Sequence, residues 1–350
     1  MLILSGFNYI ELFELSPLLI ELVTTKKEIG NMSLRIVFMG TPDFAVPSLD
    51  ILIKNGFNVV AVITSTDKWG GRGNKKLLES DVKKYAQEQG LKILQPPNLK
   101  NKAFLEELAA LKADLQVVVA FRMLPRVVWD MPRLGTINLH GSLLPKYRGA
   151  APINWAVIRG EKETGVSTFF LKHKIDTGNL LFQSKTTIGE NETVGELYNR
   201  LKYIGADLML KTLKAVEKED YTPLPQDDAL ATKAPKIFHE NCHINFEQST
   251  QAVHDFVRGL SPYPAAWTLV DGQKLKIFQT LKEIVKHDLK AGTIVTDHKK
   301  YLKIATLDGF IQLINVQLTK RKRMDIKSFL NGYTIENSEV PAKIEPNIAN

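Results

Sequence analysis

The stretch RIVFMGTPDFAVPSLDILIKNGFNVVAVIT, residues 35–64, predicts the fold of the first half of the chain. Residues 35–39 form an uninterrupted apolar run that ends at a glycine, which is typical of a buried parallel strand. Residues 43–55 have the apolar spacing of a helix, and an asparagine-glycine pair ends it. A second apolar run follows at 58–64. Strand, helix and strand joined by short links indicate a parallel sheet covered by helices.

The same alternation continues to residue 140, and an amphipathic stretch from Thr193 to Glu219 closes this half of the chain. We therefore expect a doubly wound, mostly parallel, Rossmann-like α/β sheet, in which sites lie beyond the carboxyl ends of the strands. The further elements expected are a loop over 65–76, helices at 80–89 and 103–111, and strands at 91–94, 115–121 and 136–140.

The second half has a different pattern. A helix is expected at 249–258, and short apolar strands separated by turns follow it. Two of the turns contain Asp-Gly pairs. This pattern predicts a second, smaller β-barrel domain of the OB-like kind, which often binds nucleic acid. The expected organisation is an extension (1–31), a catalytic domain (32–219), a linker rich in proline (220–237), the OB-like domain (238–335) and a tail (336–350).

Composition and charge narrow the class of protein. The chain has 350 residues, is 44% apolar, and has a single cysteine, Cys242, which excludes an internal disulfide framework and fits a reducing compartment. No apolar run has the length that a membrane span needs. The net charge of +8 is matched by residues 272–327 alone, with 13 Lys and Arg against 5 Asp and Glu. A second basic cluster lies at 68–84. Each cluster alone could be a solvated surface, but the two together favour a polyanionic partner.

The first 31 residues differ from the rest. They are apolar but contain three glutamates and no early lysine or arginine, which argues against a secretory signal or a transit peptide. The first clean strand follows Met32. We expect the extension to be dispensable, with translation naturally beginning at Met32.

The segment NLHGSLLPKYRGAAP, residues 138–152, and the turn KIDTG, residues 174–178, contain the candidate catalytic residues. Asn138 and His140 are two residues apart at the end of a predicted strand, so both side chains point to one face. Asp176 follows a second strand-like run. Amide, imidazole and carboxylate together suit the transfer of an acyl group to an amine, because the amide can hold the oxyanion and the His–Asp pair can handle the proton.

Other motifs predict no further chemistry. The first strand–helix turn lacks the glycine patterns that bind dinucleotides or ATP, so we expect no nucleotide cofactor. His239, Cys242 and His243 resemble metal ligands, but a closed zinc site needs four, and we expect no metal. Ser142 is not within a nucleophile motif and more plausibly supplies a hydroxyl to a loop or ligand.

These residues resemble the 10-formyltetrahydrofolate-dependent formyltransferases. The resemblance implies that Asn138, His140 and Asp176 are the catalytic set and that 10-formyltetrahydrofolate is the co-substrate. It also implies that a turn lines the folate site, formed by Ser142, Leu143, Leu144 and Pro145. One departure is AFRMLP, residues 120–125, where many members have a tyrosine-glycine step.

Four further segments resemble the members of this family that formylate methionyl initiator tRNA. They are residues 35–49, the glycine-rich loop GGRGNKKL at 70–77, and two segments of the second half, at 256–268 and 320–332. The implied partner is initiator Met-tRNA, bound by a monomeric cytoplasmic enzyme. The expected tRNA-binding residues are Arg72, Lys75, Lys76, Lys320, Arg321, Lys322 and Arg323.

Several alternatives share the three catalytic residues. A sugar-nucleotide amine N-formyltransferase or a purine-pathway formyltransferase would explain the catalytic set but not both basic clusters. A formyltetrahydrofolate hydrolase would need no polyanion site. A catalytically silent RNA-binding protein on this scaffold would not need Asn138, His140 and Asp176 together. Formyl transfer with different acceptors distinguishes these possibilities.

Overall fold

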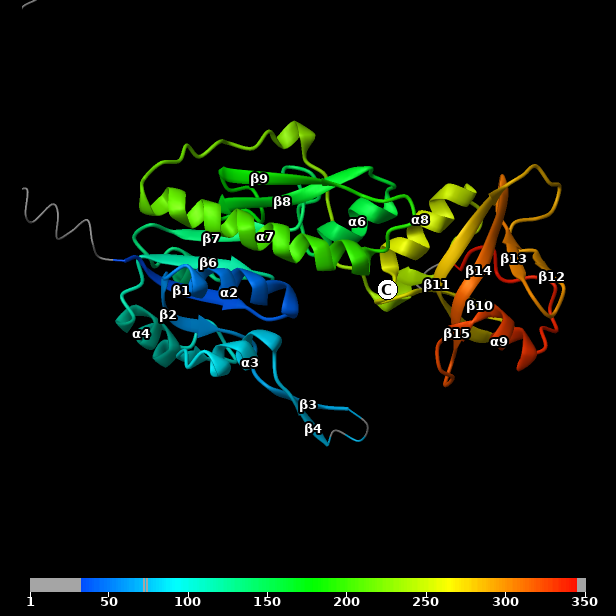
Figure 1. Ribbon diagram of the computed structural model, residues 1–350, viewed down its shortest axis with the longest axis horizontal. Helices are drawn as coiled ribbons and strands as arrows, with labels where there is room; N and C mark the ends of the chain where they lie inside the picture. Colours follow the sequence, from blue (N-terminus) through cyan, green and yellow to red (C-terminus); the bar gives the residue numbers. More distant parts are fainter. Residues whose placement is uncertain (1–32, 72, 74, 345–350) are drawn as a thin grey trace, which may run out of the picture. The chain divides into compact units, whose positions relative to one another are not determined.

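The computed structural model describes residues 33–71, 73 and 75–344 (Figure 1). The expectations for the amino-terminal extension and for Arg72 therefore lie outside the described residues. Within those residues, no helix is both long enough and apolar enough to cross a membrane.

The first half of the chain builds a seven-stranded mixed sheet. Its first five strands are parallel, and the last two pair antiparallel with their neighbours. The apolar run at the start of the chain becomes a central strand, which is buried along nearly its whole length. In spatial order the strands are β5 (Ile93–Leu94), β2 (Asn58–Ile63), β1 (Arg35–Gly40), β6 (Leu115–Val119), β7 (Thr136–His140), β8 (Glu163–Phe170) and β9 (Leu180–Thr187).

Helices cover both faces of this sheet. On one face, Phe104 and Leu108 of α4 pack on Val37, Met39 and other apolar side chains of the central strands. The opposite face lies under α2 and α7, which contact each other in front of the sheet (Figure 1). The helices of this half are α2 (Val46–Lys54), α3 (Asp81–Glu88), α4 (Lys102–Ala110), α5 (Arg126–Trp129), α6 (Pro152–Ile158) and α7 (Val194–Glu217), with a 3-10 turn η1 (Asp43–Ala45).

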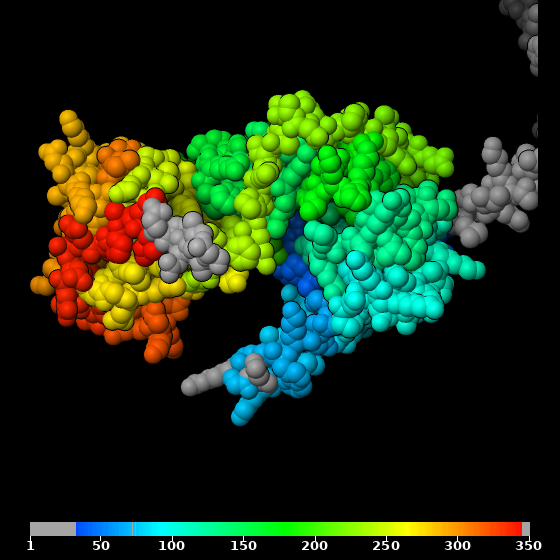
Figure 2. Space-filling model, turned by 180° about the vertical axis from the view of Figure 1, so that it is seen from behind, coloured from blue at the N-terminus to red at the C-terminus, as the bar shows by residue number. Residues whose placement is uncertain are grey.

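The predicted loop over 65–76 was wrong in part. Strands β3 (Lys68–Gly70) and β4 (Lys76–Leu78) pair antiparallel as a small separate hairpin. Figure 2 shows this segment protruding from the surface around it. The sequence gave no alternating apolar pattern here, because both strands are largely exposed to solvent.

The second half forms a separate antiparallel sheet of six strands. Alternate residues of β11 and β14, among them Leu275, Ile277, Ile311 and Leu313, are fully buried under α8 and α9. The elements are η4 (His239–Cys242), α8 (Thr250–Leu260), β10 (Ala266–Val270), β11 (Gln273–Ile284), β12 (Ile294–Thr296), β13 (Leu302–Ala305), β14 (Gly309–Leu318), β15 (Met324–Asp325) and α9 (Ile326–Asn331). The predicted fold class, a Rossmann-like sheet followed by a smaller β domain, is confirmed.

Buried polar contacts join α8 to the first half of the chain. The Arg258 guanidinium pairs with Asp255 at 2.6 Å, and both side chains are about 95% buried. Arg258 also donates to the carbonyl oxygen of Glu192 at 3.0 Å, and the Asn154 amide donates to that of Gly259 at 2.9 Å. A buried charge of this kind is tolerated only when it is paired and fully hydrogen-bonded, so this junction is specific.

Candidate active site

The strand β7 brings Asn138 and His140 to one pocket. Alternation along the strand directs both side chains away from α7, against which Leu139 packs near Gly205. His140 is 7% exposed, and Asn138 is half-buried. No group within the described residues hydrogen-bonds the Asn138 side-chain amide, so the amide is free to bind a ligand. The predicted shared face of these two residues is present in the structure.

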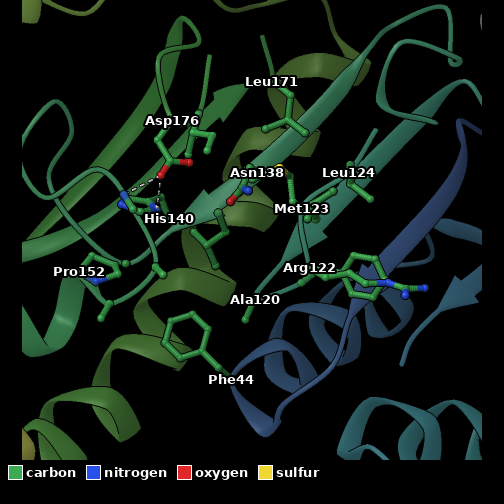
Figure 3. A pocket seen from close by; sticks show the side chains of 18 of the residues that line it. Phe44, Ala120, Arg122, Met123, Leu124, Asn138, His140, Pro152, Leu171 and Asp176 are labelled. Atoms are coloured by element: carbon green, nitrogen blue, oxygen red, sulfur yellow. Dashed lines mark hydrogen bonds and ion pairs between the residues drawn. The ribbon is translucent and has the colours of Figure 1, made fainter. Parts of the chain in front are cut away.

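The pocket has a volume of about 530 Å³ and lies beyond the carboxyl ends of β6 and β7 (Figure 3). This is where a doubly wound sheet is expected to bind ligands. Its apolar wall includes Val118, Phe121 and Leu124, and its polar wall includes the three candidate catalytic residues. The lining segments are 120–124 after β6, 138–141, 149–154 and 171–176, with Phe44, Val118, Trp129 and Tyr198.

Asp176 reaches the pocket from the loop after β8. Its Oδ2 atom accepts a hydrogen bond from the Gly149 N–H at 2.8 Å and lies 3.9 Å from His140 Nδ1 (Figure 3). Asp176 has a φ of +54°, in the left-handed region that is costly for a residue with a side chain. Two glycines make the approach possible. A Cβ on Gly178 would lie 1.5 Å from the Phe170 carbonyl oxygen, and one on Gly149 would lie 2.5 Å from that of Ala234.

The orientation of the His140 ring is set by a backbone carbonyl. His140 Nε2 lies 2.9 Å from the carbonyl oxygen of Tyr147. A carbonyl oxygen can only accept, so Nε2 must carry the proton of this bond. Nδ1 is therefore the nitrogen that faces Asp176 and the pocket, and it can hold or release a proton without disturbing the Tyr147 contact.

A residue that the sequence analysis missed holds the Asp176 loop. Gln226 Nε2 donates to the carbonyl oxygens of Asp176 at 2.9 Å and Gly178 at 2.8 Å. Gln226 Oε1 accepts from Arg148 Nη2 at 2.8 Å, and Arg148 also pairs with Asp228 at 2.7 Å. Gln226 lies in the segment predicted as a linker, which thus contacts the loop that positions the carboxylate.

The turn Ser142–Pro145 is not among the residues that line the pocket. Ser142 Oγ donates to the Lys146 carbonyl at 2.7 Å, and Ser167 Oγ donates to the Ser142 carbonyl at 2.6 Å. The Leu144 N–H donates to Ser167 Oγ at 3.0 Å, and the Leu144–Pro145 peptide bond is cis. These contacts stabilise the turn behind the catalytic strand. Its assignment as a folate contact stays a prediction.

The predicted tRNA-binding cations lie on two separate exposed surfaces. Lys75 and Lys76 are exposed on the β3–β4 hairpin. Lys320, Arg321, Lys322 and Arg323 are exposed in the turn between β14 and β15. None of these residues lines the pocket of Asn138 and His140. The structure thus separates them from the candidate catalytic residues.

The His239–His243 segment belongs to the core of the second domain. Burial lowers the pKa of His243 to about 4 and raises the pKa of the Cys242 thiol to about 11. In the part of the chain that the structure describes, no group of three or more His, Cys, Asp and Glu side chains is arranged to hold a metal ion.

The sequence matches two family models. Formyl transferase matches over residues 34–213, and Formyl transferase, C-terminal domain, matches over residues 236–334. Solved structures agree in fold. An N-formyltransferase from Helicobacter canadensis, in complex with folinic acid and dTDP-3-aminofucose, has a TM-score of 0.62 at 22% identity, covering 83% of this chain and 100% of that chain. HypX from Aquifex aeolicus, in complex with tetrahydrofolic acid, has a TM-score of 0.58 at 18% identity, covering 85% and 47%. The class defined by fold and sequence is therefore the formyl transferases.

Relatives of much higher identity narrow the class. The methionyl-tRNA formyltransferase of Parabacteroides distasonis is 53% identical over 86% of this chain and 96% of its own length. That of Bacteroides thetaiotaomicron is 50% identical, covering 87% and 97%. The chain belongs to the methionyl-tRNA formyltransferase family, and the family resemblance drawn from the sequence is confirmed.

Proposed function

We propose that the protein transfers a formyl group from 10-formyltetrahydrofolate to the α-amino group of methionyl initiator tRNA. The observation that carries the proposal is the identity of about half to relatives of this activity over both domains. The pocket supports it, because an amide, an imidazole and a carboxylate from three positions line one cavity.

The reaction forms one C–N bond and breaks another. The neutral amine of the methionyl group attacks the formyl carbon, and the formyl oxygen gains negative charge. The bond to N10 of the folate then breaks, N10 takes up a proton, and the former amine loses one. The unpaired Asn138 amide is suited to donate to the charged oxygen, and a donor held in place in this way contributes about 3–4 kcal/mol to the transition state.

His140 and Asp176 suit the proton transfers of this reaction. With Nε2 donating to Tyr147, Nδ1 is the atom that can take a proton from the amine or give one to N10. A proton on Nδ1 would face the Asp176 carboxylate, 3.9 Å away, so the ion pair would stabilise the imidazolium. Neither a metal nor a nucleotide cofactor is needed for this chemistry.

The pocket fits the size and the shape of a folate. Its volume lies in the range of about 300–1,000 Å³ that is common for small-molecule sites. The apolar wall formed by Val118, Phe121 and Leu124 suits a planar pterin ring, and the turn Ser142–Pro145 is proposed to support the same site.

The tRNA would be bound outside the pocket. Lys75, Lys76 and the cations of residues 320–323 are exposed and can reach phosphate groups, and Arg72 is proposed to act with them. A monomeric state and a cytoplasmic location remain part of the proposal.

Formyl transfer with a choice of acceptors tests the function. Purified protein is supplied with 10-formyltetrahydrofolate carrying labelled formyl and with Met-tRNA, an amino-sugar nucleotide, glycinamide ribonucleotide or no acceptor. Label in Met-tRNA alone supports the proposal. Label in the sugar nucleotide, or release of formate without an acceptor, would replace it by one of the alternatives.

The hairpin has its own test. Replacing Lys75 and Lys76 by glutamine should weaken catalysis on Met-tRNA and leave the affinity for 10-formyltetrahydrofolate unchanged, because these side chains lie outside the pocket. A parallel fall in folate affinity would assign the hairpin to the folate site instead.

A further inference from the structure

One face of the second sheet carries cations that no sequence motif assigns. In the register of the sheet, Trp267 of β10 lies opposite Lys276 of β11, and Lys276 lies opposite Gln317 of β14. Lys274 is on the same face of β11 as Lys276, because the two are separated by one residue. The residue between them, Leu275, is fully buried in the core on the other face.

Lys274 is held in place over an aromatic ring. Its Nζ atom lies 4.0 Å from the centre of the Trp267 ring, and the indole N–H of Trp267 donates to the His239 carbonyl at 2.9 Å. A cation fixed over tryptophan loses less conformational entropy on binding a ligand than a free lysine does.

This face is continuous with the basic turn at 320–323. The Thr319 N–H and hydroxyl both donate to the Lys274 carbonyl oxygen, each at 3.0 Å. On the far side of the turn, the Arg323 guanidinium lies 4.3 Å from the centre of the Phe278 ring, next along the same face of β11. We call the surface formed by Lys274, Lys276 and residues 320–323 the β11 surface.

The cations of the β11 surface lack acidic partners. Within residues 33–71, 73 and 75–344, no carboxylate forms an ion pair with any of them. Two other lysines of the same sheet are paired, Lys282 with Glu190 at 2.8 Å and Lys303 with Glu283. Burial lowers the pKa of the nearby His239, and the charges of Lys274 and Lys276 lower it further. Uncompensated positive charge is therefore concentrated at one end of the sheet.

We propose that the β11 surface binds the phosphate backbone of the tRNA, with Lys274 and Lys276 as two direct phosphate contacts. The inference rests on the proposed function for the identity of the polyanion. Charge complementarity favours a nucleic acid, since six uncompensated cations line one surface. Phosphate contacts carry no sequence information, so this surface sets affinity and orientation and leaves the choice of tRNA to other contacts.

The test is the salt dependence of tRNA binding by the full-length protein. The double variant Lys274→Gln/Lys276→Gln should bind initiator tRNA about tenfold more weakly, and the slope of log K against log salt should fall by about two, or one for each phosphate contact. The same loss is expected with an elongator tRNA. In formyl transfer, KM for Met-tRNA should rise and kcat should not change.

The matched control is Lys282→Gln/Lys303→Gln. It removes the same charge from the same sheet, at the two lysines that are ion-paired. It should leave the slope unchanged, and Lys274→Arg should retain wild-type binding. Unchanged slope and affinity in Lys274→Gln/Lys276→Gln would overturn the inference, as would an equal effect in the control, which would show a response to net charge. Failure of the wild type to formylate any tRNA would instead reject the proposed function.

Discussion

Replacement of Gln226 by leucine should lower kcat for formyl transfer about tenfold, although Gln226 lines no part of the pocket. Leucine removes the two bonds that Gln226 donates to the carbonyl oxygens of Asp176 and Gly178. These bonds hold Asp176 at a φ of +54°. Without them, the loop is free to relax to a conformation that withdraws the carboxylate from His140.

The magnitude follows from the hydrogen bonds that are lost. Each neutral bond contributes about 1 kcal/mol, so the catalytic conformation of the loop loses about 2 kcal/mol. This changes the ratio of catalytic to relaxed loop by about thirtyfold, which is an upper limit for the fall in kcat. The Gly149 N–H still binds Asp176 Oδ2 at 2.8 Å and retains part of the order. Arg148 keeps its ion pair with Asp228, so no buried charge is left without a partner.

Two further variants separate the causes. Gln226→Glu keeps an acceptor for Arg148 but cannot donate to the two carbonyl oxygens, so it should lose as much kcat as Gln226→Leu. Asp228→Asn is the control, because Asp228 is largely exposed and contacts Arg148 but not the Asp176 loop. It should keep wild-type kcat.

The assay is single-turnover formyl transfer with saturating folate and Met-tRNA. Hydrogen exchange of the peptide that contains Asp176 gives a second measurement, and its amides should exchange faster in the leucine and glutamate variants. Wild-type turnover in both would refute the reasoning. Wild-type turnover in Gln226→Glu alone would show that the contact with Arg148 matters and that the carbonyl contacts do not.

Three other predictions follow from the pocket and the sequence. Asn138→Ala and His140→Ala should each lower kcat about a hundredfold or more, with unchanged tRNA affinity, and near wild-type turnover in either would remove that residue from the catalytic set. Arg122→Gln should raise KM for 10-formyltetrahydrofolate about tenfold, since this half-buried guanidinium lines the pocket and has no ion pair within the described residues. Burial lowers the pKa of Arg122, and a folate carboxylate would offset that cost; equal KM changes with a folate lacking the glutamate would contradict this pairing. A chain that begins at Met32 should keep its activity and melting temperature, and a loss of many degrees would show that the extension packs on the fold.

The core strands were predictable because their surroundings are uniform. A strand with helices on both faces must be apolar along its length, so β1, β2, β6 and β7 are evident as apolar runs. The edge strand β9 has every second side chain outside the core and ends in QSKTT, so it was missed. The β3–β4 hairpin packs on no core, and no apolar periodicity could mark it.

The catalytic residues and the residues that hold them differ in the same way. Asn138 and His140 could be paired from the sequence because a strand fixes the relation between residues two apart. The contacts of Gln226 with Asp176 join residues fifty positions apart through backbone carbonyl oxygens, which any residue type supplies. The acceptor for His140 is likewise the carbonyl oxygen of Tyr147. A motif therefore identifies the side chains that meet the substrate, whereas the bonds that set their geometry depend on where the chain returns to the site. Variants of Gln226 test that second layer, because they leave every residue of the motif in place.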